Sequence, residues 1–154
     1  RFDKIPLYLE WTGQIATLER VQAYCQQFSQ AVTQAVIDSP WVPAVREYIM
    51  KYYMDQYFVL VTATPQDEIE QILKSLNISY CFREVFGAPS EKDYVIQSVL
   101  RRLGCPKDAA VMIGDSESDL LAAQANAIPF VLRLTPLNRR LQGAYQGPKL
   151  DGFN

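Results

Sequence analysis

The chain has 154 residues, 49% of them hydrophobic, and its 15 basic and 17 acidic residues give a net charge of −2. This composition indicates a single globular domain, with or without a small appendage, and the interspersed charges exclude a basic surface for nucleic acid. The chain contains no histidine, which excludes Ser-His-Asp and Cys-His catalysis and histidine-bearing metal sites.

The N-terminal part of the chain is predicted to be helical. Apolar residues recur at every third or fourth position over residues 15–36, which predicts one long amphipathic helix. An aromatic-rich stretch at 2–11 predicts a shorter helix before it. The segment 38–43 carries two prolines and indicates a domain boundary near Pro40. We therefore expect a helical appendage at 1–39, followed by the main domain at 40–154.

The main domain is predicted to alternate strands and helices. Residues 57–61 are apolar and β-branched without alternation, as in a strand buried on both faces of a parallel sheet. Repeated strand-helix units of this length predict an α/β fold with parallel strands and right-handed crossovers. The remaining predicted elements are helices at 43–53 and 65–77, a strand at 80–86, a helix from Ser90 that ends at Gly104, a strand at 109–113 followed by a helix, a strand at 129–132 and a short helix near 138–141.

The cysteines and the apolar runs indicate the compartment. Cys25, Cys81 and Cys105 are odd in number, widely spaced and set among apolar neighbours, which predicts buried thiols in a reducing compartment such as the cytoplasm. Zinc is not expected. No apolar run approaches the roughly 20 residues of a spanning helix, and the first residues do not resemble a signal peptide.

Polar side chains follow three predicted strands. Thr62 follows the first strand, Lys92 lies in the first turn of the helix after the second, and Asp115 ends the strand at 109–113. In a parallel sheet these positions share one rim, where ligands bind. Asp115 and Asp119 would repel each other unless a cation lies between them, which predicts Mg²⁺ or an ammonium group. A hydroxyl, an ammonium and two carboxylates suit phosphoryl transfer.

Each of these residues also has a simpler interpretation. Aspartates favour the first turn of a helix, threonines favour turns and caps, and lysines are usually solvated. Lys92, however, lies at the unfavourable end of the helix dipole. A nearby phosphate and the carboxylate of Asp119 would explain its position.

Three segments of the chain form an ordered set of motifs: Thr62 after an apolar strand, Gly87-Ala88-Pro89-x-x-Lys92, and Gly114-Asp115-Ser116-x-x-Asp119. In order and spacing they resemble motifs of the haloacid dehalogenase superfamily, and Val42-Pro43-x-Val45-x-x-Tyr48 is similar to the return from a helical cap. The resemblance implies a Rossmann-like core with a small α-helical cap, with Thr62 and Ala63 contacting the substrate phosphate and Lys92 bridging the phosphate and the nucleophile. It also implies Mg²⁺ bound partly by Asp115, with Asp119 either as a further metal ligand or as the residue that orients Lys92.

The chain departs from the family at the first motif. That motif is an apolar strand ending in Asp-x-Asp, which supplies the nucleophile and the general acid, and no segment of the chain matches it. In the family this strand lies centrally, between the strands that here end at Thr62 and Asp115. A sheet without it would expose two apolar edges. We therefore expect an N-terminal segment that carries this strand in the complete protein, and we expect the 154-residue chain alone to be inactive.

The resemblance favours a Mg²⁺-dependent phosphatase that acts on a small phosphorylated metabolite through an aspartyl-phosphate intermediate. Two alternatives remain open: a catalytically inactive module that binds a partner through its aromatic-rich helices, and another chemistry on the same scaffold, such as cleavage of a carbon-halogen bond. A phosphoacceptor receiver domain would carry its acidic cluster before the threonine and the lysine, and here Asp115 follows both. Neither nucleic acid nor a membrane is expected as a partner.

Overall fold

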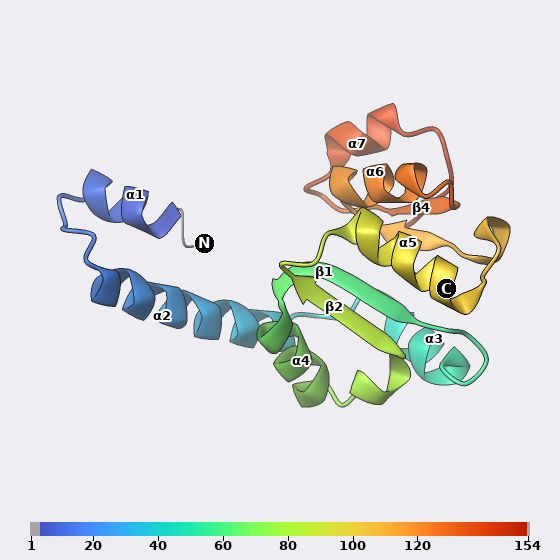
Figure 1. Ribbon diagram of the computed structural model, residues 1–154, viewed down its shortest axis with the longest axis horizontal. Helices are drawn as coiled ribbons and strands as arrows, with labels where there is room; N and C mark the ends of the chain where they lie inside the picture. The colour runs from blue at the N-terminus through green and yellow to red at the C-terminus, as the bar shows by residue number, and fades with distance from the viewer. Residues whose placement is uncertain (1–3, 154) are drawn as a thin grey trace. The chain divides into compact units, whose positions relative to one another are not determined.

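The computed structural model describes residues 4–153, and the chain divides into two compact units, Arg1–Ser39 and Pro40–Asn154 (Figure 1). Within the part of the chain that is described, no helix combines the length and the hydrophobicity needed to cross a membrane. Each unit is described below by itself.

The first unit is a pair of helices, α1 (Lys4–Trp11) and α2 (Leu18–Ile37). Thr17 caps α2, because its side-chain oxygen accepts a hydrogen bond from the backbone N–H of Arg20 at 3.3 Å. The predicted beginning of the first helix at residue 2 lies outside the described residues. A small buried cluster joins the two helices, namely Leu9, Val21 and Cys25, whereas many large apolar side chains of the unit are exposed: Leu7, Tyr8, Trp11, Ile15, Leu18, Tyr24, Phe28 and Val36.

The second unit alternates helices and strands, as the sequence predicts. Its elements are α3 (Val45–Tyr52), β1 (Val59–Pro65), α4 (Gln66–Ser75), a 3₁₀ turn (Ser79–Cys81), β2 (Glu84–Ala88), α5 (Lys92–Leu103), a second 3₁₀ turn (Lys107–Ala109), β3 (Met112–Gly114), α6 (Glu117–Ala125), β4 (Phe130–Arg133), α7 (Arg139–Ala144) and β5 (Lys149–Leu150).

The strands form two parallel sheets. β1 pairs with β2, with Val59 opposite Glu84, and the second sheet has the order β3-β4-β5, with Met112 opposite Phe130. Helix α4 packs on β1 and β2, and α5 contacts both β1 and α6 (Figure 1). The expected α/β class with a Rossmann-like parallel arrangement is therefore confirmed. β1 and β3 are not paired with each other, so among the described strands each has one unpaired edge.

The expectation that the first strand is buried on both faces is wrong for this structure. No residue of β1 or β3 is buried, and Ile113 is 41% exposed. In contrast, Phe130 and Leu132 of β4 are 6% and 0% exposed. β4 has a strand on each side, whereas β1 and β3 each have a strand on one side only. Burial therefore follows the pairing of the strand more closely than the hydrophobicity of its sequence.

Smaller differences concern the ends of elements. Of the predicted strand at 80–86, only the second half is a strand. Tyr80 and Cys81 belong instead to a 3₁₀ turn, in which the N–H of Cys81 donates to the carbonyl of Ile78 at 3.0 Å and Cys81 is 1% exposed. Helix α5 begins at Lys92 rather than at Ser90. Strand β5 was not predicted from the sequence at all.

Candidate active site

The turn between β3 and α6 is fixed by a capping box. Ser116 is the N-cap of α6, and its Oγ accepts a hydrogen bond from the N–H of Asp119 at 3.3 Å. In return, Asp119 Oδ2 accepts hydrogen bonds from the Ser116 N–H at 3.0 Å and from the Ser116 hydroxyl at 2.6 Å. These bonds hold the Asp119 carboxyl group in one position over the end of β3, where the residue is 7% exposed.

Gly114 makes room for this arrangement. A Cβ atom at position 114 would lie 2.5 Å from both Cβ and Cγ of Asp119. Real Cβ atoms do not approach other atoms so closely, so a side chain here would displace Asp119. The glycine at the end of β3 is therefore a steric requirement of the site.

Lys92 meets Asp119 from the first turn of α5. Its Nζ lies 2.5 Å from Asp119 Oδ1 and 3.1 Å from the hydroxyl oxygen of Ser118. Burial alone raises the pKa of Asp119, but hydrogen bonds from Lys92 and Ser116 and the charge of Lys92 outweigh it, so this pKa lies below its ordinary value. Asp119 is thus ionised at neutral pH. Its charge accounts for a lysine at the unfavourable end of a helix dipole.

Thr62 and Ala63 share a hollow with Lys92. The Thr62 hydroxyl lies 3.1 Å from the hydroxyl of Thr64 and accepts a hydrogen bond from the Thr64 N–H, also at 3.1 Å. The structure thus brings together three of the residues that the sequence singled out. The hollow has a volume of about 640 Å³ and is lined by Thr62, Ala63, Ala88, Pro89, Ser90, Glu91, Lys92, Asp93, Ser118, Leu121, Ala122 and Ala125.

Asp115 follows β3 directly and is exposed. Its backbone carbonyl accepts a hydrogen bond from Asn138 Nδ2 at 2.8 Å, and the same amide donates to the carbonyl of Arg133 at 2.8 Å. Within residues 4–153 its carboxylate has no hydrogen-bond or ion-pair partner. Asn138, which ties this loop to the end of β4, was not identified from the sequence, because nothing in the chain between them signals the contact.

The two aspartates differ in their capacity to bind a metal. In the described part of the chain no three histidine, cysteine, aspartate or glutamate side chains gather as a metal site. Mg²⁺ usually binds one or two carboxylates and completes its shell with water and substrate phosphate. The free carboxylate of Asp115 fits that role. Both carboxylate oxygens of Asp119 already accept hydrogen bonds. This favours Asp119 as the residue that orients Lys92 over Asp119 as a metal ligand.

A family model for haloacid dehalogenase-like hydrolases matches residues 9–132, well over half of the chain. The chain belongs to this family. The resemblance drawn from the motifs is thereby confirmed, and Thr62, Lys92, Asp115 and Asp119 all lie inside the matched range. A comparison with curated proteins gives no match to this haloacid dehalogenase-like hydrolase.

Solved structures with the same fold include proteins described as a phosphatase, a phosphoglucomutase and a hydrolase. A proposed phosphatase from Clostridium difficile is 19% identical with a TM-score of 0.65, over 86% of this chain and 63% of that one. A proposed β-phosphoglucomutase from Thermotoga maritima is 21% identical with a TM-score of 0.76, over 96% of this chain and 72% of that one. A subfamily IA hydrolase of the superfamily from Geobacter sulfurreducens is 20% identical with a TM-score of 0.60, over 89% of this chain and 86% of that one. The chain thus spans less than two thirds of the Clostridium difficile protein, and these identities establish the fold alone.

Proposed function

We propose that this chain is the larger part of a Mg²⁺-dependent phosphatase that hydrolyses a small phosphorylated metabolite. The observation that carries the proposal is the Lys92–Asp119 ion pair, whose lysine lines the same hollow as Thr62. A positive charge held by a buried carboxylate beside a hydroxyl suits the phosphate of a monoester. The phosphatases among the structures that share the fold support this choice of reaction.

Lys92 can bind a phosphate oxygen without giving up its partners. An ammonium group has three N–H bonds, and Asp119 and Ser118 accept two of them. The third is left for the substrate. The hydroxyl of Thr62 can rotate away from Thr64 and donate to a second phosphate oxygen, with Ala63 beside it in the hollow.

Asp115 is the proposed ligand of Mg²⁺, which when bound would neutralise charge on the phosphate. Its unpaired carboxylate supports this role. Asp119 is assigned to Lys92, because its carboxylate already accepts three hydrogen bonds from Lys92 and Ser116, whereas the carboxylate of Asp115 accepts none from the described residues.

The nucleophile is proposed to lie outside the 154 residues. Among the described site residues, Thr62 has no neighbouring base, Asp119 is paired with Lys92, and Asp115 is assigned to the metal. A strand ending in Asp-x-Asp that pairs with the free edges of β1 and β3 would supply it. The first aspartate would attack phosphorus while the ester oxygen leaves with a proton from the second. Water would then cleave the acyl phosphate, release inorganic phosphate and restore the carboxylate.

The helical unit Arg1–Ser39 is proposed to act as a mobile cap that selects the substrate. Its many exposed aromatic and aliphatic side chains support a role in contacts. A cytoplasmic location is proposed as well, in keeping with three cysteines that form no disulfide, two of which are buried.

The test is Mg²⁺-dependent phosphate release from p-nitrophenyl phosphate by a longer gene product that carries the Asp-x-Asp strand. Lys92→Gln and Asp115→Asn should each lower the rate by about 10²-fold or more, because each removes a charge from the phosphate site. Glu117→Gln, which alters an exposed acid in the first turn of α6, is the matched control and should leave the rate unchanged. Full activity of either site variant would refute the assignments, and an inactive parent would favour a binding module.

A further inference from the structure

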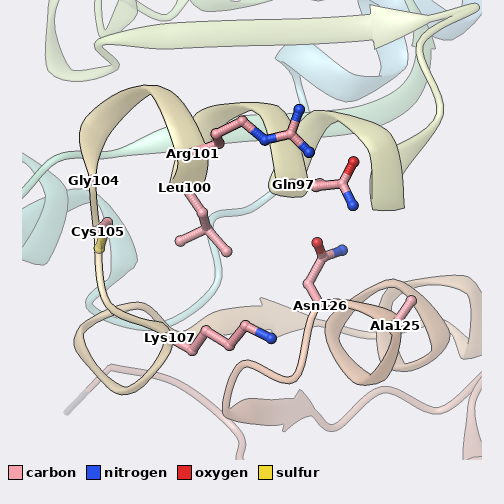
Figure 2. Close-up of a pocket in the computed structure, with 8 residues that line it drawn as sticks. All are labelled: Gln97, Leu100, Arg101, Gly104, Cys105, Lys107, Ala125 and Asn126. Atoms are coloured by element: carbon pink, nitrogen blue, oxygen red, sulfur yellow. The ribbon is translucent and has the colours of Figure 1, made fainter.

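A second hollow lies toward the other end of α5 from Lys92. It has a volume of about 390 Å³ and lies between the C-terminal half of α5, the turn that follows it and the end of α6 (Figure 2). Ala125 lines both hollows, but Thr62, Lys92 and Asp115 do not line this one. The lining residues are Gln97, Leu100, Arg101, Gly104, Cys105, Lys107, Ala125 and Asn126.

Two unneutralised cations line this hollow. Arg101 and Lys107 are exposed, no acidic residue is among the lining residues, and within residues 4–153 neither side chain has an ion pair or a hydrogen bond. The next residue of the same helix differs: Arg102 Nη2 lies 2.5 Å from Glu84 Oε1. No lining residue of the hollow compensates these two positive charges, and an anionic ligand would do so.

Helix dipoles oppose an anion here but do not cancel the cations. Both α5 and α6 end at the hollow, and each helix end carries about half a negative charge on its last carbonyls. Several of those carbonyls are already bonded, since Gly104 N–H donates to Arg101 O at 3.2 Å and Cys105 N–H donates to Leu100 O at 3.0 Å. Two full positive charges against two partial negative ones leave the hollow positive.

Asn126 adds a fixed hydrogen-bond acceptor. The residue is 8% exposed, and its Nδ2 donates to Asp93 O and to Ala122 O, each at 2.9 Å. These two bonds use both amide hydrogens and set the orientation of the amide, because the flipped group would face two carbonyls with its oxygen. Its Oδ1 accepts no hydrogen bond from the described residues. This oxygen is not one of the buried atoms that lack a partner, so it is accessible to a donor from outside the protein. Figure 2 shows its carboxamide in the space between α5 and α6, facing Gln97.

We propose that this hollow binds a small phosphate monoester that also carries a hydroxyl group. The phosphate would lie between Arg101 and Lys107, because a dianion matches two cations and phosphate oxygens suit the fork of a guanidinium. The hydroxyl would donate to Asn126 Oδ1, and the carbon chain would lie against Leu100 and Ala125. A volume of about 390 Å³ accommodates such a molecule, since one water takes about 30 Å³.

Calorimetric titration of the 154-residue chain with glycerol 3-phosphate tests the proposal. A Lys92→Gln background removes phosphate binding at the first hollow, so that the remaining binding reports on the second. In this background, Arg101→Gln and Lys107→Gln should each weaken binding by about tenfold, the loss of one charge-assisted hydrogen bond. Arg102→Gln is the matched control and should leave the affinity unchanged, because Arg102 is paired with Glu84 and lies outside the hollow. Glycerol should not bind.

Two outcomes would overturn the proposal: no binding in the Lys92→Gln background, or equal weakening by Arg101→Gln and Arg102→Gln. Backbone NMR of the unmutated chain gives a second measurement in case Lys92→Gln does not fold. Glycerol 3-phosphate should shift the amide signals of Gly104, Cys105 and Lys107, and unshifted signals there would refute the site. The same shifts should occur in the longer gene product, and their absence there would overturn the site for the complete protein. None of these results depends on phosphatase activity.

Discussion

Asp119 is held by two helices at once. Ser116 fixes one carboxylate oxygen from the start of its own helix, and Lys92 bonds the other oxygen from α5. Strand-end positions in the sequence were sufficient to predict that Thr62, Lys92 and Asp119 belong to one region. These positions could not show whether Asp119 binds a metal or orients Lys92. That choice depends on the side-chain hydrogen bonds of Ser116 and Ser118.

Asp119→Asn should destabilise the chain by about 1–3 kcal/mol, because it leaves the ammonium of Lys92 without a charged partner in a largely buried position. The free energy of unfolding in urea gives the measurement. Glu117→Gln, an exposed neighbour in the same helical turn, should change it by less than about 0.5 kcal/mol. Equal effects of the two substitutions would contradict the role given to the ion pair.

The same carboxylate should make stability depend on pH. Its folded-state pKa lies below the ordinary value of 3.8, so the ionised form stabilises the fold above that pH and the contribution is lost as the pH falls through the folded-state pKa. The difference in unfolding free energy between the parent chain and Asp119→Asn should be constant from about pH 7 to pH 5 and shrink below 3.8. A difference that stays constant to the onset of acid unfolding would show that the carboxylate is not stabilised in this way.

Gly114→Ala should destabilise the chain by about 1–3 kcal/mol, because the added methyl group overlaps the Asp119 side chain. Gly143→Ala in α7 is the matched control. A Cβ there meets nothing within 4 Å, and alanine favours a helix more than glycine does. Thermal unfolding of both variants measures the contrast, and a neutral Gly114→Ala would argue against the close packing described for this turn.

At the level of elements, periodicity predicted the helices well and the strands less well. Helix α2 follows from apolar spacing along its 20 residues, and the strand-helix alternation follows from Pro and Gly at the boundaries. The turn at Ser79–Cys81 resembles a strand in sequence because it is aromatic and apolar. Only Cys81 of this turn packs into the core, whereas Tyr80 is 48% exposed, so the turn has no strand-like alternation between two faces. β5 has only two residues, too few for a pattern, and forms because Lys149 and Leu150 pair with β4.

The unpaired edges of β1 and β3 lead to a prediction about hydrogen exchange. Amide hydrogens of β4, which has a strand on each side, should exchange more slowly than those of β1 and β3, each paired on one side only. Exchange followed by mass spectrometry or NMR measures this order. In a longer product with the proposed strand, exchange in β1 and β3 should slow while that in β4 changes little. Unchanged rates in β1 and β3 would contradict insertion of a strand between them.

For the whole molecule, the sequence motifs identified the family and the family model confirms it. The substrate could not be predicted from the sequence, because the helical unit proposed to select it exposes aromatic and aliphatic side chains that fit no single ligand. The second hollow was also not foreseen. Its two cations and its buried asparagine come from segments whose approach to one another depends on how α5 and α6 pack.

We propose that Thr62, Lys92 and Asp115 form a phosphate site whose nucleophile comes from another segment. Phosphate release from p-nitrophenyl phosphate with Mg²⁺, measured side by side for the 154-residue chain and the longer gene product, tests it most directly. We expect no release above background from the 154-residue chain and Mg²⁺-dependent release from the longer product. Release from the 154-residue chain, or none from a longer product that carries Asp-x-Asp, would contradict it.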